Sequence, residues 1–228
     1  MKRKLFAFLL ALSLALSLLP AAAMADETAE KEQIYWAVVD TNSDSTPDKL
    51  VISSALYTLA EGETLASETD RGSFDYDARF SRGILPWKYE TYPNITTAVV
   101  LANADGGKMV APVNTRAWFD QANIDRKQKL VSVDLSGLSG ERLENMCVMF
   151  QYAKQLETVN FPADFDTSHV TDMSYMFNYC EKLQTVNVSG WDMSNVERIE
   201  WMFDHCLKVN NLDTSRWNIT SKITNLQR

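Results

Sequence analysis

A repeat of 26 or 27 residues constrains the fold of this chain more than any other feature of its sequence. The string "HVTDMSYMFNYCEKLQTVNVSGW" at residues 169–191 returns almost at once as "NVERIEWMFDHCLKVNNLDTSRW" at residues 195–217. A methionine-phenylalanine pair marks each unit, at Met149-Phe150, Met176-Phe177 and Met202-Phe203. A unit this short cannot bury its apolar face alone, so the units are expected to stack and share one core.

Each unit is predicted to contain a strand, a turn and a helix. The string "LQTVNV" at residues 183–188 alternates apolar and polar side chains, as a half-buried strand does. The string M-x-x-M-F places apolar residues at i, i+3 and i+4, the spacing of one helical face. Pattern and period together predict an α/β fold of leucine-rich-repeat type, a solenoid of short parallel strands, each followed by a helix.

The first 25 residues have the features of a secretory signal peptide. Lys2, Arg3 and Lys4 form a positive start, residues 5–19 an apolar run, and Ala23-Met24-Ala25 a small-residue cleavage site. A membrane anchor is the alternative, but the run is short and stops at Pro20. We expect a bacterial protein that is secreted or displayed on the cell surface, with no membrane span after cleavage.

The mature chain is predicted to have two regions. Residues 26–129 are expected to form a β-rich N-terminal cap with loops, beginning with a hairpin around "DTNSDSTPD". Residues 130–228 are expected to hold about three and a half repeat units. The last unit stops before its next Met-Phe pair, so we expect either a fragment of a longer repeat protein or another cover for that edge.

Charge narrows the range of partners. The sequence has 22 Lys and Arg against 30 Asp and Glu, a net charge of −8. Removing the three leader cations leaves 19 against 30, or −11 on the mature chain. This balance repels nucleic acid and anionic membranes, so no nucleic-acid partner is expected.

Neither of the two motifs that suggest chemistry is predicted to act as a site. In Asp204-His205-Cys206 a cysteine, which could act as a nucleophile, follows a histidine, which could act as a base. Cys206 shares its repeat column with Cys180, and His205 shares its column with Tyr179, so the structural repeat accounts for both residues. We therefore predict no catalytic residues and no enzyme activity.

The second motif is a run of oxygen-bearing side chains at calcium-loop spacing, namely Asp40, Asn42, Asp44 and Asp48. Ser45 stands where that loop needs glycine, and Val51 where it needs glutamate. A solvated hairpin turn is favoured, and neither a metal nor a cofactor is predicted.

The cysteines raise a separate question. Cys180 and Cys206 should stack in successive units with α-carbons about 5 Å apart, within reach of a disulfide, but parallel side-chain directions favour a buried reduced pair. Cys147 shares its column with Ser174 and Glu200, which predicts that it is exposed.

Outward-facing strand positions are the predicted binding face. Such a repeated polar sheet surface is what repeat proteins use for recognition, although a merely solvated sheet fits the same pattern. The face consists of two columns, Ser132, Thr158, Thr185 and Asn211, and Asp134, Asn160, Asn187 and Asp213.

The string "FDTSHVTDMSYMFNYCEKLQTVNVSGWDMSNVERIEWMFDHC" resembles the BspA-like leucine-rich repeat surface proteins of bacteria over about residues 130–228. The resemblance implies display at the cell surface, adhesive binding to host or matrix proteins, and no catalytic activity. The expected function is thus binding of an extracellular protein ligand. The alternative is a structural spacer, or a fragment of a longer multidomain surface protein, without a binding role of its own.

Overall fold

The computed structural model describes residues 33–65, 67, 71–75, 87, 91–122, 129–220 and 222–223. All of these lie in one compact unit, Gln33–Arg228. The predicted signal peptide, residues 1–25, lies outside the described residues. The predicted boundary between residues 129 and 130 falls between two neighbouring strands of one sheet.

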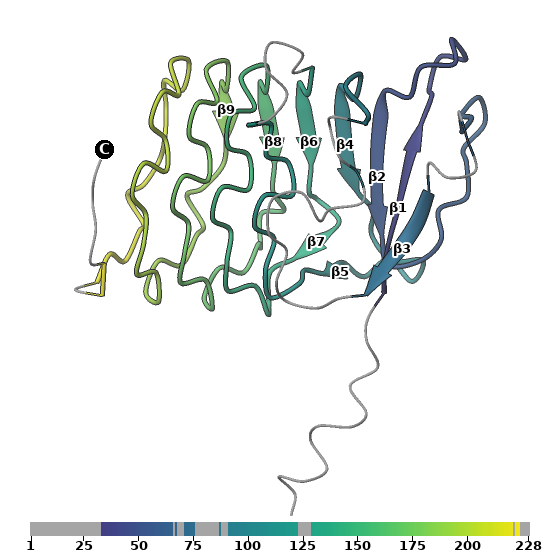
Figure 1. Ribbon diagram of the computed structural model, residues 1–228. Coiled ribbons are helices and arrows are strands. Elements are labelled where there is room, and N and C mark those ends of the chain that lie inside the picture. Colours follow the sequence, from purple (N-terminus) through teal and green to yellow (C-terminus); the bar gives the residue numbers. More distant parts are fainter. Residues whose placement is uncertain are drawn as a thin grey trace, which may run out of the picture. The chain divides into compact units, whose positions relative to one another are not determined.

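The described chain builds a mixed seven-stranded sheet and a two-stranded sheet (Figure 1). The larger sheet has the order β3-β1-β2-β4-β6-β8-β9, and the smaller one pairs β5 with β7. The strands are β1 (Gln33–Val39), β2 (Lys49–Ser53), β3 (Arg71–Asp75), β4 (Thr97–Val100), β5 (Met109–Val110), β6 (Ser132–Asp134), β7 (Leu138–Ser139), β8 (Thr158–Asn160) and β9 (Thr185–Val186).

The N-terminal part is antiparallel. β1 pairs antiparallel with both β2 and β3, which confirms the predicted hairpin. Asp40 begins the turn of this hairpin and accepts hydrogen bonds from the backbone N–H groups of Asn42 and Ser45. β2 then pairs with β4 in parallel, so the hairpin joins the repeats without a break in the sheet.

From β4 onward every neighbouring pair of strands in the larger sheet is parallel and in register. Thr97, Ser132, Thr158 and Thr185 follow one another across β4, β6, β8 and β9. In the next column the apolar side chains of Val133, Val159 and Val186 point inward and are buried. The predicted stacking of parallel strands is therefore confirmed, and it begins one unit earlier than the Met-Phe pairs indicate.

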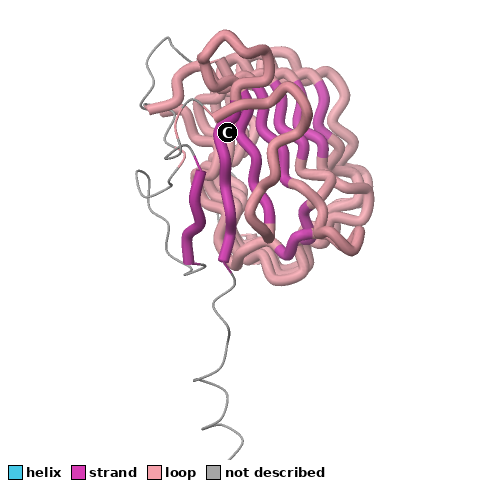
Figure 2. The backbone as a smooth tube through the Cα atoms, turned by 90° about the vertical axis from the view of Figure 1, so that its right-hand side faces the viewer, coloured by secondary structure: helices cyan, strands magenta, loops and turns pink. Residues whose placement is uncertain are grey.

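The predicted helix in each unit is wrong, and with it the α/β solenoid of leucine-rich-repeat type. The part of the chain that the structure describes contains no helix, only short strands joined by loops and turns (Figure 2). The M-x-x-M-F strings lie instead in what we call the turn segments, residues 114–121, 145–152, 172–179 and 198–205.

Hydrogen bonding explains why a turn segment is not a helix. Within a segment, N–H groups bond to the third residue back, as from Met149 to Met146 at 3.2 Å and from Gln151 to Val148 at 3.2 Å. The intervening N–H groups leave the segment and bond to carbonyl oxygens of the next unit, from Met146, Val148, Phe150 and Tyr152 to Asp172, Ser174, Met176 and Asn178. A helix would need these same N–H groups for its own i to i−4 bonds.

Left-handed backbone conformations produce this alternation. One column of residues with φ between 52° and 62° contains Ala117, Val148, Tyr175 and Trp201. A second, with φ between 58° and 60°, contains Tyr152, Tyr179 and His205. Left-handed φ is uncommon outside glycine and is incompatible with an α-helix. The apolar spacing of M-x-x-M-F therefore reports which residues are buried, and not a helix.

The core lies between the strands and the turn segments. Phe119, Phe150, Phe177 and Phe203 form one stack, with ring centroids 5.0 to 5.2 Å apart and planes within 11°. Phe177 is fully buried within it. Phe119 of the first turn segment stacks on Phe150, so this segment belongs to the same stack.

Candidate functional site

Five of the eight residues of the predicted binding face, which we call the strand face, lie on β6, β8 and β9. The prediction of a strand position is wrong for the other three, Asn187, Asn211 and Asp213, which lie in the loops after β9. The register places Ser132 beside Thr158, Thr158 beside Thr185, and Asp134 beside Asn160. A shallow open groove of about 430 Å³ runs over the later units. It is lined by Thr158, Val159, Asn160, Gln184, Thr185, Val186, Asn187, Val188, Asn211 and Asp213.

The two columns differ in what their side chains do. Among the residues that the structure describes, the side chains of Thr158, Thr185 and Asn211 make no hydrogen bond, and all three are exposed. Their hydroxyl and amide groups are therefore available to a ligand.

The second column is used by the fold itself. Asp134 accepts from the N–H of Ser136 at 2.9 Å, Asn187 from Ser189 at 3.2 Å, and Asp213 from Ser215 at 3.0 Å. Each bond closes a tight turn just after the strand.

Asn160 is the exception in this column, because the residue two positions later is Pro162, which has no N–H. Its side-chain amide donates instead to Asp134 Oδ1 at 3.0 Å.

Asp213 also shows the electrostatic effect of such a turn. Its carboxylate accepts from the hydroxyl of Ser215 at 2.6 Å as well as from the backbone N–H. These bonds favour the charged form and lower the pKa of Asp213 below its ordinary value.

A second hollow, of about 610 Å³, lies on the turn segments and shares no lining residue with the groove. We call it the turn-face hollow, and it is lined by Arg116, Cys147, Val148, Gln151, Ser174, Tyr175 and Arg198. The sequence explains its shape, because Cys147, Val148 and Ser174 are small and buried where longer side chains would fill the space.

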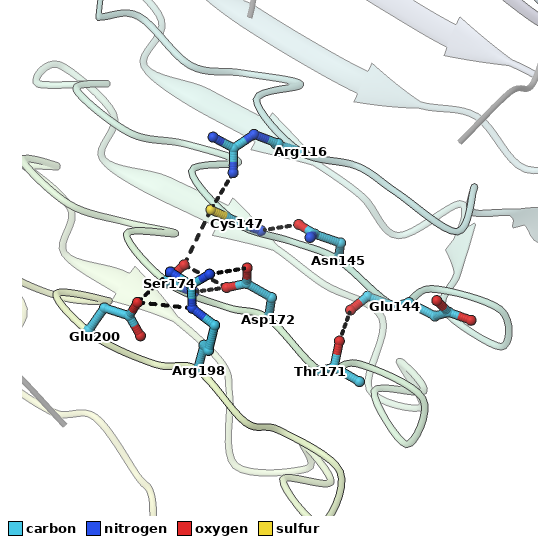
Figure 3. A network of polar contacts seen from close by, with 9 residues as sticks. All are labelled: Arg116, Glu144, Asn145, Cys147, Thr171, Asp172, Ser174, Arg198 and Glu200. Carbon is cyan, nitrogen blue, oxygen red and sulfur yellow. Dashed lines mark hydrogen bonds and ion pairs between the residues drawn. The ribbon is translucent and has the colours of Figure 1, made fainter. Parts of the chain in front are cut away.

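A polar network forms the floor of this hollow (Figure 3). The Ser174 hydroxyl lies 3.2 Å from Cys147 Sγ and 2.5 Å from Asp172 Oδ1. Arg116 Nη1 contacts the same sulfur from the opposite side, at 2.6 Å. Cys147 is only 4% exposed, so the prediction that it is exposed is wrong. Burial raises the pKa of its thiol, which is therefore not activated as a nucleophile.

Arg198 closes the other end of the network. Its Nε and Nη2 donate to Glu200 Oε1 at 3.0 and 2.6 Å, and its Nη1 lies 3.7 Å from Asp172 Oδ2. These contacts compensate the charge of Glu200, which is 5% exposed.

Most residues in the two left-handed columns have aromatic side chains, and these stack on one another. Tyr152, Tyr179 and His205 stack with centroids 5.0 and 4.1 Å apart, and Tyr175 lies nearly parallel to Trp201 at 6.4 Å. The turn segments thus carry tyrosine, tryptophan and arginine, the residue types that dominate binding energy at protein interfaces.

The Asp204-His205-Cys206 motif does not bring a base to a thiol. His205 Nδ1 lies 2.7 Å from Asp204 Oδ2, whereas Cys206 Sγ donates to the carbonyl oxygen of Phe177 at 3.1 Å. Burial raises the pKa of Cys206 to about 12. Cys180 and Cys206 are both free. Cys180 is buried as expected, but Cys206 is only half-buried, so the expectation of a buried pair holds for Cys180 alone. That the protein is not an enzyme stays a prediction.

The side chains of the calcium-loop pattern accept hydrogen bonds from backbone N–H groups. Asn42 and Asp44 accept from the N–H groups two positions later, as Asp40 does. Burial raises the pKa of Asp40, but the backbone N–H bonds outweigh it, so the net shift is downward. No group of three or more His, Cys, Asp or Glu side chains that could hold a metal occurs among the described residues.

Within the described ranges no helix is long and apolar enough to cross a membrane.

Sequence reasoning missed the turn-face hollow because it assigned the turn segments to helices. The signal was present in the repeat columns just before the Met-Phe pairs. There the side chains change from small in Ala117 and Val148 to large in Tyr175 and Trp201. A change of size along a stacked column predicts a hollow beside the small residues.

Comparison with known proteins identifies one family. The family model described as "Mycoplasma protein of unknown function, DUF285" matches residues 114–228, half of the chain. No curated protein and no solved structure matches the chain. The resemblance to BspA-like leucine-rich repeat proteins is therefore wrong as a family assignment. The match begins at the first turn segment, where the structure also begins the stack of turn segments.

Proposed function

This chain belongs to the DUF285 family, and we propose that it is a secreted or surface-displayed protein that binds an extracellular protein ligand through its strand face. The ligand of such an adhesion protein is a host or matrix component. The proposal involves no catalytic step, metal or cofactor.

One observation carries the proposal. The side chains of Thr158, Thr185 and Asn211 are exposed, lie in one groove and form no hydrogen bonds within the described chain. They contribute neither to the core nor to the turns. Donors and acceptors repeated about 4.8 Å apart can contact an extended ligand over several units, with a small gain from each.

A structural spacer is the second candidate. The residues that line the groove include no aromatic side chain and no arginine. Interface hot spots are enriched in these residue types, so the composition of the groove favours a solvated sheet with no ligand.

Binding of the expected mature chain, residues 26–228, to immobilised fibronectin, laminin and collagen separates the candidates. The test variant is Thr158→Lys with Thr185→Lys, which fills the groove and leaves the turn-forming column intact. We expect it to weaken binding at least about tenfold, because two long side chains obstruct the face.

The matched control is Thr58→Lys with Thr64→Lys, which adds the same charge at two exposed threonines outside the groove. Circular dichroism of both variants checks folding. Equal binding by the test and control variants would refute the strand-face site. Absence of binding by the unmodified chain would favour the spacer.

A further inference from the structure

The two arginines at the ends of the turn-face hollow have different partners. Arg198 is fully engaged, because Glu200 and Asp172 both lie against its guanidinium. Arg116 makes no ion pair with any carboxylate among the described residues. The only side chain to which its guanidinium is bonded there is Cys147.

A thiol is a poor partner for a guanidinium. Sulfur is a weak hydrogen-bond acceptor, whereas arginine stays charged and presents five N–H donors in a planar fork. Burial keeps Cys147 in its neutral form, so the sulfur does not compensate the charge. Arg116 therefore retains donors for a stronger acceptor, and the fork of arginine fits a carboxylate with two parallel hydrogen bonds.

The hollow also has an apolar wall. Val148 and Tyr175 line it between the two arginines, and the ring of Tyr175 packs against the cluster of Ala117, Cys147 and Val148. Its volume of about 610 Å³ lies within the range of ligand sites. A ligand that fits this arrangement carries its carboxylate on an apolar stem.

We propose that the turn-face hollow is a second protein-binding site, in which Arg116 binds a glutamate side chain of a partner protein while Val148 and Tyr175 contact the methylenes of that side chain. The site lies apart from the groove of the strand face and does not depend on that proposed function. A net charge of −11 on residues 26–228 opposes acidic partners at long range, so the contact depends on the short-range pairing with Arg116.

The probe is N-acetyl-L-glutamate amide, titrated into the isotope-labelled chain of residues 26–228 at low salt and followed by nuclear magnetic resonance. One charge-assisted contact and a short apolar stem predict roughly millimolar affinity. We expect the signals of Arg116, Cys147 and Tyr175 to shift together. N-acetyl-L-glutamine amide has the same shape without the charge and is expected to shift none of them.

Arg116→Gln is expected to weaken binding at least about tenfold, because it removes the guanidinium that holds the carboxylate. Arg216→Gln is the matched control: it removes one positive charge from an exposed arginine outside the hollow and should bind as the unmodified chain does. Arg116→Lys keeps the charge but loses the fork, so it should bind with intermediate affinity.

Three results would overturn the proposal: equal binding of the glutamate and glutamine probes, an unchanged affinity in Arg116→Gln, or no shift at any of the three signals. Acetate is the last probe, because it has the carboxylate without the apolar stem. Acetate binding as tightly as the glutamate probe would show that the apolar stem contributes nothing. The hollow would then be a site for any small carboxylate rather than for a protein side chain.

Discussion

The strand side and the turn side of each repeat unit are held together in similar ways but present different surfaces. Both are joined to the next unit by backbone hydrogen bonds in parallel register. The strand side is extended and shows threonine and asparagine, whereas the turn side alternates left-handed residues and shows tyrosine, tryptophan and arginine.

This difference shows what apolar spacing can and cannot encode. On the strand side, alternation predicts both the burial of Val159 and its extended backbone, because only a strand alternates with period two. On the turn side, the spacing of Met173, Met176 and Phe177 predicts burial correctly, since all three are fully buried. It does not predict backbone conformation, because a series of turns can bury residues at the same spacing.

Replacing a buried core residue by alanine, on the turn side or on the strand side, should give the largest change in the free energy of unfolding. Phe177→Ala removes a ring held between Phe150 and Phe203, and we expect it to lower the free energy of unfolding by about 3 to 5 kcal/mol. Val159→Ala on the strand side removes less apolar surface and should cost about 1.5 kcal/mol. Chemical denaturation of both variants measures the difference. Equal costs would contradict a core centred on the phenylalanine stack.

A smaller effect separates a left-handed turn from a helix. At Tyr175, where φ is 56°, glycine tolerates the conformation and alanine does not. We therefore expect Tyr175→Gly to be more stable than Tyr175→Ala by about 1 kcal/mol. In a helix the order would reverse by a similar amount, since alanine is the better helix former. Both variants lose the same ring contact with Trp201, so each serves as control for the other.

The smallest effect concerns the turn that directly follows Trp191. Asp192 accepts from the backbone N–H of Ser194 and from the Asn218 amide, both at 2.9 Å. The bond from the Ser194 N–H, then the Ser194 hydroxyl and Asn218, lower the pKa of Asp192 below its ordinary value of 3.8.

A lowered pKa fixes the sign of the pH dependence. The stabilisation is present above the ordinary pKa and is lost as pH falls through the lower folded value. Asp192→Asn keeps an accepting oxygen but cannot be protonated in this range. We expect its stability to fall less than that of the unmodified chain between about pH 5 and pH 2. Thermal unfolding across this range measures both curves, and identical slopes would contradict the assignment.

Much of the fold could be predicted from the sequence, and the errors have one cause. The repeat period located β6, β8 and β9, the inward column of Val133, Val159 and Val186, and the stacking of these units. It failed on the turn segments because the left-handed conformation at Tyr175 or His205 leaves no residue signal when glycine is absent.

Of the two candidate sites, one could be predicted from the sequence and the other could not. The strand-face residues were predicted from their column positions, and the structure separates the free side chains of Thr158 and Thr185 from the turn-forming ones of Asn187 and Asp213. The turn-face hollow could not be predicted from a helical assignment. In a helix, Arg116 and Tyr175 would have pointed in other directions.

The sign of φ in the turn segments is the most direct test of this account. Scalar couplings and cross-correlated relaxation, measured by nuclear magnetic resonance on the labelled chain, report it for each residue. We expect positive φ at Val148, Tyr175 and Trp201, and negative φ at the neighbouring Met149, Met176 and Met202. Negative φ throughout these segments, with amide hydrogen bonds from each residue to the fourth residue before it, would restore the helix and contradict the account.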